Sequence, residues 1–196
     1  VISAVMCFFF FVFIFSFFFF LVYGDHLDLH SFPTDALPIL IEALNISEGR
    51  GTTIPFELLG APFIDEERLK KELDSRSVPG CIFRTHNFIP TFNKYTGRLC
   101  NGIQIHVTSP ADYFPVGTAM EIIDAIIKTS PEGSFRFIPP PYEYEMELMP
   151  FDILSGDSFM RNALISRTPP ATVKERWRDE INEFRKEFTE FSGYPE

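Results

Sequence analysis

The first 23 residues of this chain contain no charged side chain, and this segment limits the possible folds more than any other feature of the sequence. Ten of the 24 phenylalanines lie between Phe8 and Phe20. About 20 apolar residues in a helix are enough to cross a bilayer. A helix that is apolar on every side lies either in a membrane or inside a large core. The segment is therefore either a membrane anchor or no part of the folded domain.

The flanking residues and the codons favour the second interpretation. No Lys or Arg occurs before Arg50, and no small-residue cleavage site follows the apolar run. Every residue from Cys7 to Tyr23 is Phe or a residue whose codon differs by one base from TTT, as a translated thymine run would give. Residues 25–39 resemble translated sequencing-adapter sequence. We therefore expect residues 1–39 to be non-native read-through, with a membrane anchor formed by residues 1–23 as the alternative.

Charge and cysteine content exclude several classes of function. The formal net charge of −10 argues against nucleic-acid binding, which needs clustered cations to displace phosphate counterions. Three cysteines (Cys7, Cys81 and Cys100) are too few for a disulfide scaffold and lack the CxxC spacing of zinc sites. We expect no metal and no cofactor.

From Leu40 onward the pattern predicts helices interleaved with short strands, without regular βαβ spacing. Helices are expected at Asp65–Leu73 with Asp65 as N-cap, from Pro115 to about Ser130, around Phe159–Leu164, and from a capping box at Thr172 to Phe188. Strands are expected at Cys81–Arg84, Ile103–Val107 and Phe135–Ile138. The class is α+β, a small mixed sheet with flanking helices, preceded by the apolar segment.

The densest polar cluster is residues 45–53, in which two glycines bracket Arg50. Glycine allows a close backbone approach, so that neighbouring side chains can converge on a small ligand. Arg50 has the geometry to clamp a carboxylate, and Glu48 can transfer a proton or hold hydroxyl groups. The competing interpretation is a turn in which Glu48 and Arg50 pair with each other.

A second group consists of Gln104 and His106, which share one face of an alternating strand. Phe92, in a polar segment, has the flat ring of a sugar-stacking platform. The alternatives are an ordinary exposed strand face for the first two residues and a core position for Phe92. No P-loop, Rossmann, HExxH or nucleophile-elbow pattern is present.

Residues 45–64 (NISEGRGTTIPFELLGAPFI) resemble the "N-x-SEGRGT…PFE..GAP" signature of the exo-β-N-acetylmuramidase (NamZ) family. Residues 89–116 are similar to a second family stretch, and residues 151–156 and the Trp177 to Phe184 spacing fit the C-terminal pattern. The chain departs from the family at Ala43-Leu44, where Gly-Thr is usual.

The resemblance implies a function and a domain organisation. Family members release N-acetylmuramic acid from peptidoglycan fragments, using a cleft between a Rossmann-like half and a smaller C-terminal domain. It implies that residues 40–64 end the first half and that residues 65–196 form the second domain. The principal catalytic glutamate is expected in the missing half, so this chain alone is expected to be inactive, and an extracytoplasmic parent is implied.

The resemblance also implies which residues form the site. Glu48 is the catalytic candidate in this chain, and peptidoglycan fragments or muramyl sugars are the expected partners. The alternative function is a non-catalytic wall-binding module, membrane-tethered if residues 1–23 are genuine. The expected sugar-binding residues are Asn45, Ser47, Arg50, Thr52, Phe92, Gln104 and His106.

Overall fold

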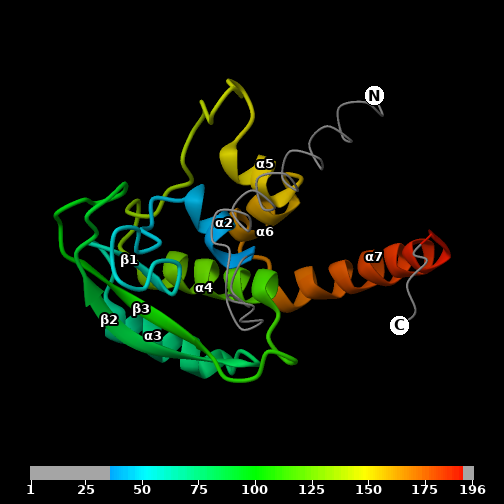
Figure 1. Cartoon of the computed structure of the whole chain (residues 1–196), viewed down its shortest axis with the longest axis horizontal. Helices are drawn as coiled ribbons and strands as arrows, with labels where there is room; N and C mark the ends of the chain where they lie inside the picture. Colours follow the sequence, from blue (N-terminus) through cyan, green and yellow to red (C-terminus); the bar gives the residue numbers. More distant parts are fainter. Residues whose placement is uncertain (1–35, 192–196) are drawn as a thin grey trace, which may run out of the picture. The chain divides into compact units, whose positions relative to one another are not determined.

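The computed structural model describes residues 36–191, so the membrane-anchor and read-through interpretations of the first residues lie outside the described part. This part contains six helices and three strands. In chain order they are α2 (Ala36–Glu42), β1 (Leu58–Ala61), α3 (Glu66–Arg76), β2 (Cys81–Phe88), β3 (Cys100–Val107), α4 (Pro115–Thr129), α5 (Pro150–Ser155), α6 (Phe159–Ile165) and α7 (Pro170–Phe191) (Figure 1). Among these helices, none is long and apolar enough to cross a membrane.

The strands form an antiparallel sheet in the order β1-β3-β2. The central strand is β3, where Ile103 pairs with Leu59 of β1 and Thr85 of β2. Gly102 lets β1 approach closely, because a Cβ atom there would lie 1.9 Å from the carbonyl oxygen of Leu59. The predicted α+β class is confirmed, with a sheet that is antiparallel in every pairing rather than mixed.

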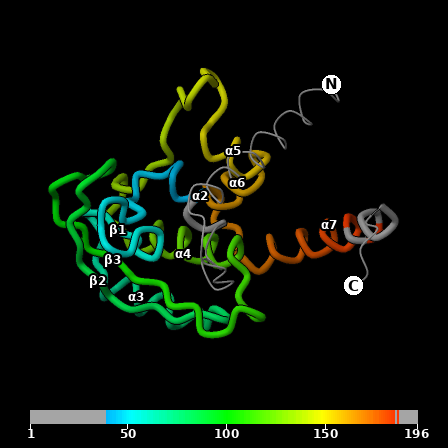
Figure 2. The backbone as a smooth tube through the Cα atoms, viewed as in Figure 1, coloured from blue at the N-terminus to red at the C-terminus, as the bar shows by residue number. Residues whose placement is uncertain are grey.

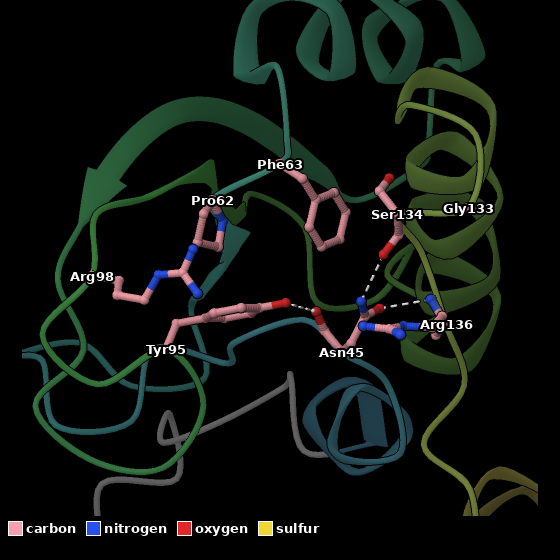
Figure 3. Close-up of a pocket in the computed structure, with 8 residues that line it drawn as sticks. All are labelled: Asn45, Pro62, Phe63, Tyr95, Arg98, Gly133, Ser134 and Arg136. Carbon is pink, nitrogen blue, oxygen red and sulfur yellow. Dashed lines mark hydrogen bonds between the residues drawn. The ribbon is translucent and has the colours of Figure 1, made fainter.

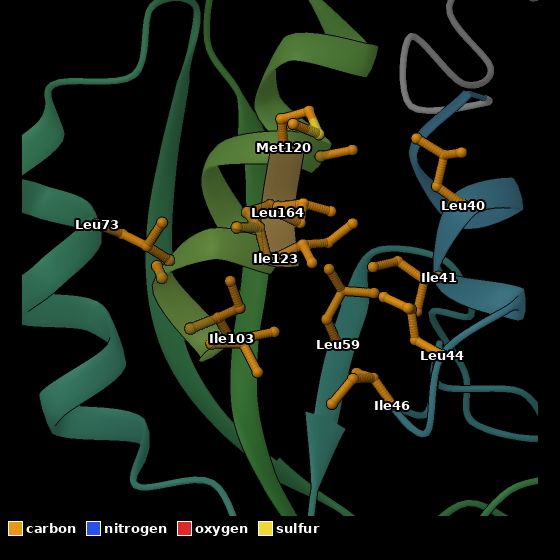
Figure 4. Close-up of a cluster of buried hydrophobic side chains, with 14 of the residues drawn as sticks. Leu40, Ile41, Leu44, Ile46, Leu59, Leu73, Ile103, Met120, Ile123 and Leu164 are labelled. Atoms are coloured by element: carbon orange, nitrogen blue, oxygen red, sulfur yellow. The ribbon is translucent and has the colours of Figure 1, made fainter. Parts of the chain in front are cut away.

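One hydrophobic core joins segments that are far apart in the sequence (Figure 4). Ile41 from α2 and Leu44 just after it are buried together with Leu59 of β1 and Met120 of α4. Residues 40–64 therefore pack into the same unit as residues 65–191. The expected domain boundary, with residues 40–64 ending a first half and residues 65–196 forming a second domain, stays a prediction.

Two helices that the sequence predicted, α3 and α4, contribute buried residues to the core. The Asp65 carboxylate accepts a hydrogen bond from the Arg68 amide at 2.9 Å and caps α3. Leu69 and Leu73 of α3 are buried, and this helix contacts β2, β3 and α4. α4 begins with Pro115 and contacts α2, α3, α6 and α7, so it is the central helix of the fold.

Two local predictions are wrong. Residues 135–138 form no strand, because only Phe137 makes an isolated bridge, with Leu44, and three prolines without N–H groups follow. α7 begins at Pro170, so Thr172 lies inside its first turn instead of at the N-cap. Proline at the first helical position is already preorganised for the helix and lacks only an N–H that would have no partner.

Between α4 and α5 the chain is irregular, and its middle extends away from the neighbouring helices (Figure 2). Tyr144 in this segment is 97% exposed, and Met146 is exposed as well. The first part of the same segment, by contrast, is tied to the residue that follows α2: the Ile138 amide donates to the Ala43 carbonyl at 2.9 Å. The tied part forms one wall of the hollow described below.

Candidate functional site

The SEGRGT loop, residues 47–52, is anchored at both ends. Ser47 exchanges two backbone hydrogen bonds with Gly60 of β1, at 2.8 and 3.0 Å. Gly49 and Gly51 have φ values of +72° and +78°, which favour glycine. The Thr91 hydroxyl donates to the Gly51 carbonyl at 2.7 Å, and a Cβ atom on Gly51 would lie 2.3 Å from that hydroxyl oxygen. The loop is therefore fixed against the segment between β2 and β3.

Glu48 is buried at the base of this loop with a side chain that is 1% exposed. Its Oε1 accepts from Nε of Arg50 at 2.6 Å, and its Oε2 accepts from Nζ of Lys94 at 3.1 Å. Both carboxylate oxygens are thus occupied by cations. This geometry favours a structural role for Glu48 over the catalytic role that the sequence suggested.

Lys94 is the member of the site that sequence reasoning missed. Its ammonium group donates to the carbonyls of Ile41 and Ile46 at 2.9 and 3.0 Å, besides Glu48. All three of its donor sites are used. Burial lowers the pKa of Lys94, while the charge of Glu48 acts in the opposite direction. The available signals were its polar segment, which also contains Phe92, and its place in the second stretch that resembles the family.

Arg50 lies at the edge of this cluster, with a side chain that is 31% exposed. Its Nη2 lies 3.6 Å from Oε1 of Glu42, and its guanidinium stands over the ring of Phe56 at 5.2 Å. The four charges of Glu42, Glu48, Arg50 and Lys94 balance. Burial, helped by the charge of Glu42, raises the pKa of the nearby Tyr142 to about 12. The expected pairing of Glu48 with Arg50 is present, and the guanidinium keeps an exposed edge.

Asn45 uses its side chain to hold a distant segment. Its Nδ2 donates to the Ser134 carbonyl at 2.8 Å, and its Oδ1 accepts from the Arg136 amide at 2.8 Å. The Tyr95 hydroxyl donates to the Asn45 carbonyl at 2.9 Å. Asn45 therefore joins the segment after α2 to two other segments.

These three segments, together with Pro62 and Phe63 after β1, line an open hollow of about 440 Å³ (Figure 3). In the close-up, Arg98 and Arg136 lie on opposite sides of it, with the Phe63 ring between them and the Tyr95 ring below. Neither Glu48 nor Arg50 lines this hollow. Its lining consists of Asn45, Pro62, Phe63, Tyr95, Arg98, Gly133, Ser134 and Arg136.

The remaining predicted residues are divided between structural bonds and exposed positions. Ser47 accepts from the Gly49 amide at 3.3 Å, and Thr52 donates to the Gly49 carbonyl at 2.7 Å, so both hydroxyls serve the loop itself. Phe92 is 63% exposed instead of lying in a core.

Gln104 and His106 lie half-buried on β3, on one face of the sheet as predicted. Nε2 of Gln104 donates to Oε2 of Glu57 at 3.2 Å. Within residues 36–191, no group of three His, Cys, Asp or Glu side chains is placed to hold a metal ion.

Comparisons with known proteins agree on one family. Residues 38–194 match the family model described as "Exo-beta-N-acetylmuramidase NamZ, C-terminal". The chain is 39% identical over 147 residues to the peptidoglycan beta-N-acetylmuramidase NamZ of Bacillus subtilis (strain 168), a match that covers 75% of this chain. It spans 33%, about a third, of the length of that relative.

Two crystal structures of DUF1343 family proteins from Bacteroides fragilis NCTC 9343 are similar in fold. The first has a TM-score of 0.66 at 20% identity, covering 83% of this chain and 41% of that one. The second has a TM-score of 0.51 at 20% identity, covering 80% of this chain and 38% of that one. At this identity the likeness concerns the fold alone.

Proposed function

This chain belongs to the exo-β-N-acetylmuramidase NamZ family as a C-terminal domain, and on that basis we propose that it forms the muramyl-sugar-binding part of a peptidoglycan-degrading glycosidase. The parent enzyme hydrolyses terminal N-acetylmuramic acid from the non-reducing ends of wall fragments. It acts outside the cytoplasm, where the wall lies. The observation that carries the proposal is the family match over residues 38–194.

We propose that the chain alone is inactive. Glycosidases generally use two carboxyl groups that flank the scissile bond. Glu48, the candidate in this chain, has both oxygens engaged by cations and a side chain that is 1% exposed. The chain also spans only a third of its Bacillus relative. The main catalytic residue is therefore assigned to a part of the parent that this chain does not contain.

Arg50 is proposed to contact the sugar. N-acetylmuramic acid carries a lactyl carboxylate, and a guanidinium can bind a carboxylate through two parallel hydrogen bonds. Glu48 and Phe56 hold the Arg50 side chain in one orientation and leave an exposed edge. Such preorganisation reduces the entropy that is lost on binding. Exposed Phe92 is proposed as the stacking surface, and Gln104 and His106 as hydrogen-bonding groups along β3.

Binding is tested by titrating the full chain with N-acetylmuramic acid and following the Gly51 amide by NMR. We expect Arg50→Ala to weaken the response at Gly51 at least about tenfold, because a hydrogen bond to a charged group contributes about 1.5–3 kcal/mol. Arg178→Ala, which removes an exposed arginine of α7, is the matched control. An unchanged titration in Arg50→Ala would exclude the carboxylate clamp.

Hydrolysis is tested on a chromogenic β-N-acetylmuramide. We expect no turnover by the chain alone, and turnover above background would contradict the proposed inactivity.

The alternative is a non-catalytic wall-binding module, which the sequestered carboxylate of Glu48 also favours. A chimera distinguishes the two functions: the C-terminal domain of the Bacillus relative is replaced by residues 36–196 of this chain. Retained hydrolysis supports the enzyme part. A folded chimera that binds N-acetylmuramic acid without hydrolysing the chromogenic substrate supports the binding module.

A further inference from the structure

We propose that the hollow between Arg98 and Arg136 is a second binding site of this domain, which takes the carboxylate of an acidic sugar independently of Arg50. The proposal rests on the proposed function only for the identity of the sugar. The site itself is argued from the charges, the shape and the fixed rim of the hollow.

The charges of the hollow are not balanced. Among residues 36–191, neither Arg98 nor Arg136 forms an ion pair, and none of the residues that line the hollow is acidic. Arg50 differs, because Glu42 and Glu48 both neutralise it. Two like charges around one concavity repel each other and raise the local potential, so a bound anion gains from both.

Both guanidiniums act on the hollow. Arg98 stands over the ring of Tyr95 at 5.6 Å. Burial raises the pKa of Tyr95, while the charges of Arg98 and Arg136 act in the opposite direction, so both charges reach its phenol group. The hollow is therefore electropositive on two sides.

The shape fits a sugar ring that carries an acid group. A hollow of about 440 Å³ lies within the range of sites for small organic ligands. Pro62, Phe63 and Tyr95 supply apolar surface between the two guanidiniums (Figure 3). A sugar has an apolar C–H face and a hydroxylated edge, so one molecule can use the rings and the cations together.

The rim of the hollow is fixed before any ligand arrives. Asn45 binds the backbone of Ser134 and Arg136 on one side and accepts from the Tyr95 hydroxyl on the other. These bonds leave the side chain of Arg136 free, because only its backbone is used. A preorganised rim spares the ligand the entropy of ordering it.

The test is an NMR titration of the full chain, with the Gly133 amide reporting on the hollow and the Gly51 amide reporting on the SEGRGT loop. The probes are N-acetylmuramic acid, N-acetylglucosamine, which lacks the carboxylate, and glycerol 3-phosphate. The variants are Arg98→Ala, Arg136→Ala, Arg50→Ala and the control Arg178→Ala. Arg98→Lys separates charge from the planar fork, and a thermal unfolding curve of each variant confirms folding.

We expect N-acetylmuramic acid to shift Gly133 and each hollow variant to weaken that response about tenfold, which corresponds to about 1.4 kcal/mol. Arg50→Ala and Arg178→Ala should leave the Gly133 response unchanged, and N-acetylglucosamine should bind at least about tenfold more weakly. The proposal is overturned if Arg98→Ala and Arg136→Ala are folded and respond at Gly133 as strongly as the unsubstituted chain does. The proposal is also overturned if N-acetylglucosamine binds as tightly as N-acetylmuramic acid, or if glycerol 3-phosphate binds more tightly than N-acetylmuramic acid. If N-acetylmuramic acid shifts Gly133 but not Gly51 in the unsubstituted chain, that result would instead count against the proposed function.

Discussion

Replacing Lys94 by methionine is expected to destabilise the fold strongly, although Lys94 belongs to no helix or strand. The side chain is 14% exposed and Glu48 is 1% exposed, so the pair is shielded from water. Removing one partner of a buried pair costs about 3–5 kcal/mol, because the remaining charge stays buried. The carbonyls of Ile41 and Ile46 also lose their donor. Glu48 keeps Arg50, so the lower end, about 3 kcal/mol, is the expected loss.

The assay is urea unfolding, followed by far-UV circular dichroism and by the fluorescence of Trp177, the single tryptophan. For a slope of about 2 kcal/mol/M, a loss of about 3 kcal/mol lowers the midpoint by about 1.5 M. Lys71→Met, which removes an exposed lysine of α3, is the matched control and should stay within about 0.5 kcal/mol of the parent.

A double-mutant cycle with Glu48→Gln isolates the pair. Methionine and glutamine remove both charges, so the double variant should be more stable than the sum of the single losses predicts. A coupling free energy of at least about 1 kcal/mol is expected between contacting charges. Lys94→Met with a midpoint equal to that of the control, or additive single variants, would refute the idea that this ion pair holds the SEGRGT loop.

Two further predictions concern the loop and the thiols. In urea unfolding, Gly51→Ala should lower the free energy of unfolding by about 1–3 kcal/mol more than Gly97→Ala. Both glycines have positive φ, but of the two only Gly51 has a close neighbour, which an added Cβ atom would meet at 2.3 Å. Equal losses would show that the backbone angle alone matters. Burial raises the pKa of Cys100 from 9.0 to about 11, so its alkylation at pH 8, followed by peptide mass spectrometry, should be at least about 100-fold slower than in urea. Because the thiol of Cys100 ionises at lower pH in the unfolded chain, its ionisation should also reduce the stability of the fold as the pH rises from 9.0 to about 11. Fast alkylation of Cys100 in the native protein would contradict the raised pKa on which both expectations rest.

The sequence alone determined the features that depend on neighbouring residues. The N-cap at Asp65, the start of α4 at Pro115 and the α+β class follow from local patterns, because capping and side-chain periodicity are short-range effects. The pairing of Glu48 with Arg50 was among the interpretations of the loop, since only Gly49 separates them in the sequence. The family resemblance rested on the same local strings and is confirmed by the match over residues 38–194.

Only the tertiary structure decided which charges are balanced. Lys94 reaches Glu48 across 46 residues of sequence, and this contact gives the buried carboxylate a second cationic partner besides Arg50. Arg98 and Arg136 line opposite sides of the same hollow because Asn45 binds the backbone of the segment that carries Arg136. Such contacts depend on how whole segments pack, and no spacing rule within a strand or helix encodes them. Whether a carboxylate or a guanidinium faces water or another charge is therefore decided by the fold, and with it what that group can bind.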